Sequence, residues 1–273
     1  MSDNLTLSVI MPSLNEENNI EQAVFSTLDA FKKYSIQGEI IVVNDGSTDN
    51  TRNIVENIIK IHNNVRLISH DKPEGIGYSF WDGIKSSAMD VVVMFPGDNE
   101  NDPEDALSFL PLMHHVDIII PFIHNREVRD KKRRFISTLY RSIINISFGI
   151  NLNYTNGTTF YRRAILDEVE INNFGFFYQA ELLIKLIRRG YLFAEVPNFL
   201  GIRNGGNSKA TTLSSLLSVM KGYLKLAYNV HIKGIAGQRR HYKELYDKST
   251  AYIRQNDFEE RAKNRCLNIT LIC

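Results

Sequence analysis

The chain has 273 residues, and 43% of them are hydrophobic, which is enough for one large domain or for a domain with an appendage. Its 32 Lys and Arg residues nearly balance its 31 Asp and Glu residues, so we expect no nucleic-acid partner. The two cysteines, Cys266 and Cys273, match no metal-binding spacing. Because the N-terminus also lacks the apolar segment of a signal peptide, we expect a cytoplasmic protein.

Short apolar runs alternate with helical patterns through the first 95 residues. The runs predict strands at residues 5–11, 39–43, 65–69 and 91–95. Between them, apolar residues recur at helical spacing, and Ser47 or Thr48 can cap the second helix. This alternation predicts an α/β fold with a doubly wound, mostly parallel sheet.

Acidic residues gather directly after the fourth expected strand. This buried run ends at Pro96-Gly97 and continues into Asp98 and Glu100. In open α/β sheets ligands bind beyond the carboxyl ends of the strands, so an oxygen-rich site for a divalent cation is expected here. A polar turn before a helix capped near Asp102 explains the same residues equally well.

A basic run follows the fifth expected strand, at residues 116–121. Its cations are Arg126, Arg129, Lys131, Lys132, Arg133 and Arg134. Next comes an amphipathic helix whose apolar face contains Phe135, Ile136, Leu139, Tyr140, Ile143 and Ile144. Such a combination is typical of a helix on a membrane surface. A solvated run before an ordinary core helix is the alternative.

The second half of the chain predicts strands at 158–162 and 191–197 around a helix at 176–189. The glycine-rich stretch 203–209 has two cations and a hydroxyl, which suits a phosphate, although a plain linker has the same composition. From Leu213 the chain looks helical, and Lys221 and Lys225 make its apolar segment costly to insert into a bilayer. We therefore expect a catalytic domain at 1–212 and a helical appendage at 213–273.

Several motifs occur together in a fixed order between residues 5 and 210. They are Pro-Ser-Leu-Asn-Glu at 12–16, Val-Val-Asn-Asp-Gly-Ser-Thr-Asp at 42–49, Gly97-Asp98 with Pro103-Glu104, residues 177–183, and residues 203–209. In this order the chain resembles inverting family 2 glycosyltransferases, closest to the dolichyl- or polyprenyl-phosphate sugar synthases. The resemblance implies a GT-A, Rossmann-like sheet with a C-terminal helical appendage. Pro96 departs from the family pattern, which usually has Asp there.

The resemblance also implies a site for a UDP- or GDP-sugar. The implied donor-binding residues are Pro12, Asn15, Glu16, Asn44, Asp45, Gly75 and Gly97. Asp98 and Glu100 would hold Mg²⁺ or Mn²⁺, which would neutralise the leaving nucleoside diphosphate. An acceptor hydroxyl would need a general base, for which Asp98 and Glu181 are the candidates.

The resemblance further implies an acceptor phosphate, gripped by cations and a serine at a membrane surface. The implied residues are Arg126, Arg133, Arg134, Ser137, Arg203, Ser208 and Lys209. The expected reaction is sugar transfer to a polyprenyl phosphate at the cytoplasmic face of a membrane. Transfer to a glycan hydroxyl is the nearest alternative, and a non-catalytic nucleotide-sugar binder is a further one. The sequence leaves the oligomeric state open, a homo-oligomer included.

Overall fold

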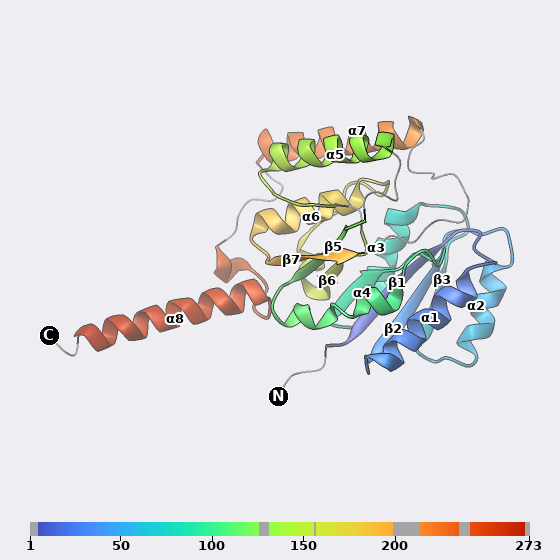
Figure 1. Cartoon of the computed structure of the whole chain (residues 1–273), viewed down its shortest axis with the longest axis horizontal. Helices are drawn as coiled ribbons and strands as arrows, with labels where there is room; N and C mark the ends of the chain where they lie inside the picture. The colour runs from blue at the N-terminus through green and yellow to red at the C-terminus, as the bar shows by residue number, and fades with distance from the viewer. Residues whose placement is uncertain (1–4, 126–130, 156, 199–212, 235–240, 271–273) are drawn as a thin grey trace.

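A single mixed sheet organises the chain, shown in Figure 1. The computed structural model describes residues 5–125, 131–155, 157–198, 213–234 and 241–270. In these residues the strands are β1 (Leu7–Ser13), β2 (Gly38–Asn44), β3 (Val65–Ser69), β4 (Val91–Met94), β5 (Ile118–Ile123), β6 (Phe160–Arg162) and β7 (Phe193–Asn198). Their order is β3-β2-β1-β4-β6-β5-β7, and β6 alone among the described strands runs antiparallel to its neighbours. The expected mostly parallel α/β sheet is confirmed.

Helices cover both faces of the sheet because its central strands are apolar on both faces. All residues of β1 and β4 are buried. On one face pack α1 (Ile20–Lys33), α2 (Thr51–Ile59) and the short α4 (Pro103–Leu107). The opposite face carries α3 (Ile76–Ser86) and α6 (Tyr178–Arg189). The sheet is thus the middle layer, and its strand ends are left for the site.

Helix α6 is itself an inner layer. Residues 178–186 are all buried, although the helix contains Gln179, Glu181 and Lys185. One side of α6 packs on the sheet, and the other packs on α5 (Lys131–Phe148) and α7 (Leu213–His231). Figure 1 shows α5 and α7 beyond α6, on the side away from the sheet. This arrangement makes α5 and α7 an outer layer.

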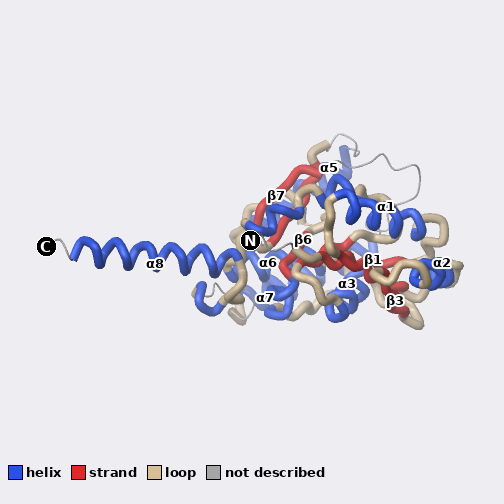
Figure 2. The backbone as a smooth tube through the Cα atoms, turned by 90° about the horizontal axis from the view of Figure 1, so that it is seen from below, coloured by secondary structure: helices blue, strands red, loops and turns tan. Residues whose placement is uncertain are grey.

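Helix α8 (Thr250–Thr270) projects from the body of the molecule, as Figures 1 and 2 show. Its first turn is nevertheless anchored by Asp117, a fully buried residue directly before β5. The Asp117 carboxylate accepts hydrogen bonds from the backbone N–H groups of Thr250 (2.6 Å) and Ala251 (3.1 Å). The division of the chain at residue 212 stays a prediction.

Two local expectations differ from the structure. Strand β1 continues through Pro12 to Ser13, because β4 pairs with β1 only as far as Ile10 and Pro12 therefore needs no N–H for that ladder. The cap expected from Ser47 or Thr48 is wrong. Helix α2 begins at Thr51, whose N–H and hydroxyl both bind the side chain of Asp49. The helix expected to begin near Asp102 is confirmed, with Asp102 as its N-cap.

Candidate active site

The ends of β1, β2 and β4 lie side by side at one edge of the sheet. The N–H of Asp45 donates to the carbonyl of Ser13 (2.9 Å), and the N–H of Gly97 donates to the carbonyl of Pro12 (3.0 Å). Asp45 and Asp98 therefore flank the end of β1. Because neighbouring strands are about 4.8 Å apart, the two backbones are separated by roughly 10 Å. The structure thus brings these two predicted residues to the same edge.

The loops after β1 and β2 are interlocked by side chains. Asn15, which has a φ of 58°, accepts a hydrogen bond from the N–H of Thr48 (2.9 Å) and donates its own N–H to Ser47 (3.0 Å). The N–H of Glu16 donates to the hydroxyl of Thr51 (2.8 Å), and its half-buried carboxylate accepts from Asn19. Asn15 therefore positions the loop, while Glu16 places a carboxylate beside the end of β1.

Asp45 is a buried predicted donor residue, with 4% of its surface exposed, and its carboxylate accepts three hydrogen bonds. Its Oδ1 accepts from His70 (2.8 Å) and from the N–H of Glu74 (2.9 Å), and its Oδ2 accepts from the N–H of Gly75 (2.9 Å). Burial alone would raise the pKa of Asp45. The hydrogen bonds from His70, Glu74 and Gly75 outweigh it, so the pKa lies below its ordinary value.

These bonds draw the segment 70–75 over the end of β2. Gly46, with a φ of 71°, leaves room for it, since a Cβ there would lie within 2.8 Å of the backbone of Lys72 and Pro73. The N–H of Gly75 is occupied by Asp45, so its predicted contact to a donor would have to be made by other atoms. Asn44 is buried and accepts from the N–H of Ser47, which shapes the same turn.

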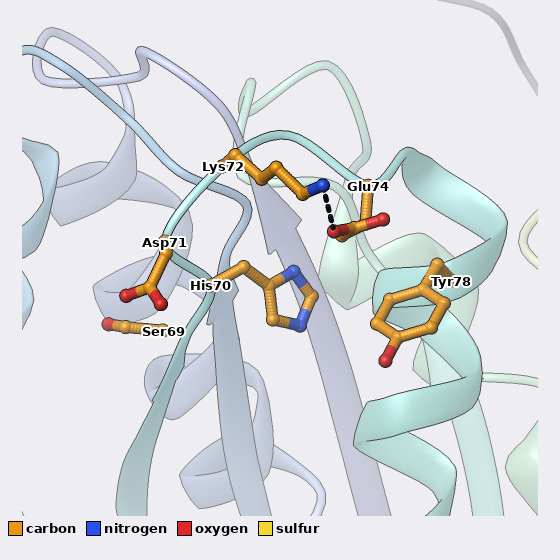
Figure 3. Close-up of a pocket in the computed structure, with 6 residues that line it drawn as sticks. All are labelled: Ser69, His70, Asp71, Lys72, Glu74 and Tyr78. Atoms are coloured by element: carbon orange, nitrogen blue, oxygen red, sulfur yellow. Dashed lines mark ion pairs between the residues drawn. The ribbon is translucent and has the colours of Figure 1, made fainter.

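A pocket of about 590 Å³ opens beside this segment, at the end of β3 (Figure 3). Its lining residues are Ser69, His70, Asp71, Lys72, Glu74 and Tyr78. Figure 3 shows the His70 ring pointing toward Tyr78 beneath the ion pair of Lys72 and Glu74. Sequence reasoning missed His70, because its partner Asp45 is 25 residues away and a single histidine after a strand carries no signal.

Gly97 presents Asp98 at the edge. A Cβ at Gly97 would lie 2.2 Å from the Ser13 hydroxyl, so glycine is needed for the chain to pass β1 this closely. Asp98 is partly exposed, and one carboxylate oxygen accepts from the N–H of Glu100 (3.1 Å). In the part of the chain that the structure describes, no group of three or more His, Cys, Asp or Glu side chains could hold a metal.

Glu181 has a different environment from Asp98. Its carboxylate, 3% exposed as a residue, accepts from Lys185 Nζ (2.6 Å) and from the N–H of Asn172 (3.2 Å). It therefore ties α6 to the loop that precedes it. A catalytic role for Glu181 stays a prediction, and of the two candidate bases Asp98 is the one at the strand ends.

A second pocket, of about 150 Å³, lies between α5 and the end of β5. It is lined by Ile123, Arg134, Ser137, Thr138, Arg141, Asn153 and Tyr154. The structure thus brings together two predicted acceptor residues and adds Arg141, one helical turn after Ser137. Arg141 lies beyond the basic run, so the sequence did not single it out. Arg126, Arg203, Ser208 and Lys209 lie outside the described residues, as does the side chain of Arg133.

Helices α5 and α7 expose large apolar side chains. On α5 these are Phe135, Ile136, Leu139, Ile143 and Ile146, and on α7 they are Leu216, Leu217, Met220, Leu224 and Tyr228. The helices meet where Ser147 bonds the Tyr223 hydroxyl (2.8 Å) and Phe148 stacks on His231. We call the ten side chains the apolar outer face. Among the described residues, no helix has the length and apolarity needed to cross a bilayer.

Residues 8–170 match the model of a protein family described as Glycosyl transferase family 2. The chain belongs to this family. The matched residues contain the ends of β1, β2 and β4 together with all residues that line the two pockets. The expected family is therefore confirmed.

Two curated relatives of this family 2 glycosyltransferase are named for lipid phosphates. It is 28% identical over 218 residues to "Dolichol-phosphate mannosyltransferase" of Pyrococcus furiosus, which covers 75% of this chain and 59% of the relative. It is 25% identical over 163 residues to "Undecaprenyl-phosphate 4-deoxy-4-formamido-L-arabinose transferase" of Pseudomonas fluorescens, covering 59% of this chain and 48% of the relative. The chain thus spans about half the length of these relatives, or slightly more.

Solved structures confirm the GT-A-like fold of this family 2 glycosyltransferase. Glucosyl-3-phosphoglycerate synthase from Mycobacterium tuberculosis, in complex with Mg²⁺ and UDP, superposes with a TM-score of 0.60. The match covers 82% of this chain and 79% of that one, at 21% identity. The same enzyme with Mn²⁺, UDP and phosphoglyceric acid gives a TM-score of 0.59 at 22% identity, covering 82% and 78%.

Proposed function

We propose that this glycosyltransferase moves a sugar from a UDP- or GDP-sugar to a polyprenyl phosphate at the cytoplasmic face of a membrane. The observation that carries the proposal is the pocket with Arg134, Ser137 and Arg141, because it lies on the same helix as part of the apolar outer face. A phosphate and a long apolar chain would need both features. The names of the two lipid-phosphate relatives support the same acceptor class.

Helix α5 separates these two features onto different faces. Residues 134, 137, 138 and 141 recur at helical spacing and line the pocket. Residues 135, 139, 143 and 146 follow a second stripe, which is exposed and apolar. A lipid phosphate could therefore reach the arginines while the apolar stripe contacts the acyl region of a bilayer. Helix α7 would extend the apolar contact.

The donor would bind at the ends of β1 and β2. Glu16 and Asp45 place carboxylate oxygens there, which can accept hydrogen bonds from ribose hydroxyls or base N–H groups. Because the pKa of Asp45 is lowered, its carboxylate remains charged at neutral pH. The interlocked loops hold Glu16 in place before the donor arrives.

Asp98 and Glu100 are the residues that would hold a divalent cation at the donor site. Their carboxylate oxygens are ligands that Mg²⁺ and Mn²⁺ accept, and Asp98 lies at the strand ends. Two carboxylates leave coordination positions for diphosphate oxygens. When bound, the ion would supply neutralisation of the charge that develops on the leaving nucleoside diphosphate. Asp98 would be the residue that orients the diphosphate toward the acceptor pocket.

A phosphate acceptor needs little help from a general base, because it is already an anion at neutral pH. The ion pair of Glu181 with Lys185 agrees with this, because a carboxylate that is already paired with a lysine is poorly suited to act as a general base. Arg134 and Arg141 would hold the acceptor phosphate as charge-assisted donors, with the Ser137 hydroxyl beside them. In this proposal residues 1–212 perform the transfer, and α7 adds membrane contact.

A donor screen tests the proposal. The protein is incubated with Mg²⁺ or Mn²⁺, polyprenyl phosphate in detergent and a panel of labelled UDP- and GDP-sugars, and lipid-linked label is counted. We expect product from at least one donor, and a loss of about 100-fold or more for Asp98→Asn. Product that forms equally well with Asp98→Asn, or no lipid product from any donor, would contradict the proposal. Nucleotide binding without turnover would favour the non-catalytic binder.

A further inference from the structure

His70 connects two carboxylates from different elements. Its Nδ1 lies 2.8 Å from Oδ1 of Asp45, at the end of β2, and its Nε2 lies 3.4 Å from Oδ2 of Asp82, on α3. The side chain is only 10% exposed. Carboxylate oxygens from two different elements therefore face the two nitrogens of the ring. Asp82 therefore contacts the ring nitrogen that does not face Asp45, and it helps to hold His70 toward Asp45.

The position of the ring is also fixed by packing. The backbone N–H of His70 donates to the carbonyl of Asn44 (2.9 Å), and its ring meets Tyr78 edge-on at 5.3 Å. Tyr78 in turn packs edge-on against Phe174 at 5.6 Å, and the carbonyl of Phe174 accepts from the N–H of Gly77. His70 therefore has little freedom to turn away from Asp45.

Asp45 has few acceptor positions left. Two carboxylate oxygens offer about four lone-pair positions, and three are used by His70, Glu74 and Gly75. One position remains for a ligand, and its direction depends on how the carboxylate is held. Other charged groups beside the ring are Asp71, Lys72 and Glu74, which line the pocket with it.

We propose that His70, supported by Asp82, is a positioning residue for donor binding. The imidazole fixes the rotation of the Asp45 carboxylate and the closure of the 70–75 segment, so that the remaining lone pair of Asp45 points to the nucleoside. This inference rests on the proposed function, because it assigns Asp45 to a nucleotide-sugar donor. It predicts that His70 affects donor affinity and leaves the transfer step unchanged.

Two substitutions test the contacts of the two ring nitrogens separately. In His70→Asn the amide nitrogen can occupy the place of Nδ1 and keep the bond to Asp45, whereas in His70→Gln the amide reaches toward Asp82. We expect the donor KM to stay within about 3-fold for His70→Asn and to rise about 10-fold for His70→Gln and His70→Ala, with kcat within about 2-fold. Asp82→Ala should raise the donor KM by about 3-fold. His62→Asn, at a histidine that packs on Phe25, is the matched control and should change neither constant.

Calorimetric titration with UDP and GDP, without acceptor, keeps this inference separate from the proposed reaction. Weaker nucleotide binding by His70→Gln than by His70→Asn supports the positioning role even if no sugar transfer is found. Equal nucleotide binding by all variants would overturn it, and so would a lower kcat with an unchanged donor KM. A wild-type protein that binds neither nucleotide would overturn it as well. Should His70→Ala fail to fold, the comparison of His70→Asn with His70→Gln still decides.

Discussion

At the scale of single residues, Asp45 shows how a buried carboxylate can stay charged. Burial opposes the charged form, but a histidine and two backbone N–H groups bind the carboxylate directly. The same bonds close the 70–75 segment over the end of β2. Structure and charge at this site therefore depend on one another.

The pH dependence of stability tests this account of Asp45. Its pKa in the folded state lies below the ordinary 3.8, so its contribution to stability is complete above about pH 5 and is lost as the pH falls through the folded value. Asp45→Asn should lower the free energy of unfolding by about 1.5–3 kcal/mol at pH 7. Urea titrations from pH 7 to pH 3 should show the difference between variant and wild type narrowing. A difference that is constant across this range would contradict the assignment.

The sequence predicted which residues end the strands but not what holds them. Asp45 and Asp98 follow apolar runs and could be placed at the sheet edge from the pattern alone. His70 and Arg141 could not be identified in this way, because the partner of His70 and the pocket around Arg141 are formed by segments that are distant in the sequence. Glu181 shows the reverse case, because its family position gave no sign of the buried ion pair with Lys185.

At the scale of elements, α5 is the most informative helix. Its pocket-lining stripe carries two arginines, whereas its exposed stripe is apolar up to Ile146, which is 83% exposed. A helix whose outer face meets only water would have polar residues in this stripe, and an ordinary core helix would bury the stripe. The two stripes are the features that the proposed contacts with an acceptor phosphate and with a lipid surface require.

The arginine pair should act on the acceptor alone. In Arg134→Ala/Arg141→Ala we expect the KM for polyprenyl phosphate to rise by about 10- to 100-fold, since two charge-assisted contacts are lost. The donor KM should remain within about 2-fold. Steady-state kinetics with each substrate varied in turn provides the measurement, and Arg52→Ala, at an exposed i,i+4 pair, is the control. A donor KM that rises as much as the acceptor KM would count against the pocket as an acceptor site.

The apolar outer face should act on membrane binding. Replacing Ile143 and Leu224 by Glu should weaken binding to vesicles that contain anionic lipid by about 10-fold or more, because two apolar contacts with the lipid are lost and two negative charges are added. Vesicle co-sedimentation measures this, with nucleotide binding as the check on folding. Ile61→Glu, at an exposed apolar residue after α2, should have no effect. An equal loss of vesicle binding in both variants would show that the apolar outer face is not the membrane-binding surface.

Periodicity predicted most of the elements, because the parallel strands are short apolar runs and the helices have one apolar stripe. Strand β3 was placed at its observed residues, and the ends of the other strands differ from the predicted ones by at most two residues. The position of β6 between β4 and β5 could not be predicted from periodicity, because the insertion of an antiparallel strand depends on pairing between distant segments. The burial of residues 178–186 of α6 was not predicted, because these residues include polar side chains.

At the scale of the whole molecule, Asp117 joins the N-terminal sheet to the C-terminal helix. Besides Thr250 and Ala251, its carboxylate accepts from the N–H of Leu192 and lies 3.4 Å from Arg162. A fully buried charge with this many partners is costly to disturb. The start of α8 is therefore part of the folded core, although the rest of the helix extends away from it (Figure 2).

Removal of this anchor should affect both stability and the attachment of α8. Asp117→Ala should lower the free energy of unfolding by about 3–5 kcal/mol, because Arg162 loses its carboxylate partner and several buried N–H groups lose their acceptor. Limited proteolysis should then cut near residues 241–250 faster than in the wild type. Asp167→Ala, which removes an exposed partner of Arg163, should cost less than about 1 kcal/mol. Similar losses in the two variants would refute the anchoring role.

Acceptor competition tests the central claim most directly. Wild-type protein, Mg²⁺ and a labelled donor would be mixed with vesicles that contain polyprenyl phosphate and with an equimolar oligosaccharide in the same tube. The products would then be separated into organic and aqueous phases. We predict that the label appears on the lipid, and that Arg134→Ala/Arg141→Ala reduces it. Label on the oligosaccharide alone would contradict the assignment of the lipid phosphate as the acceptor.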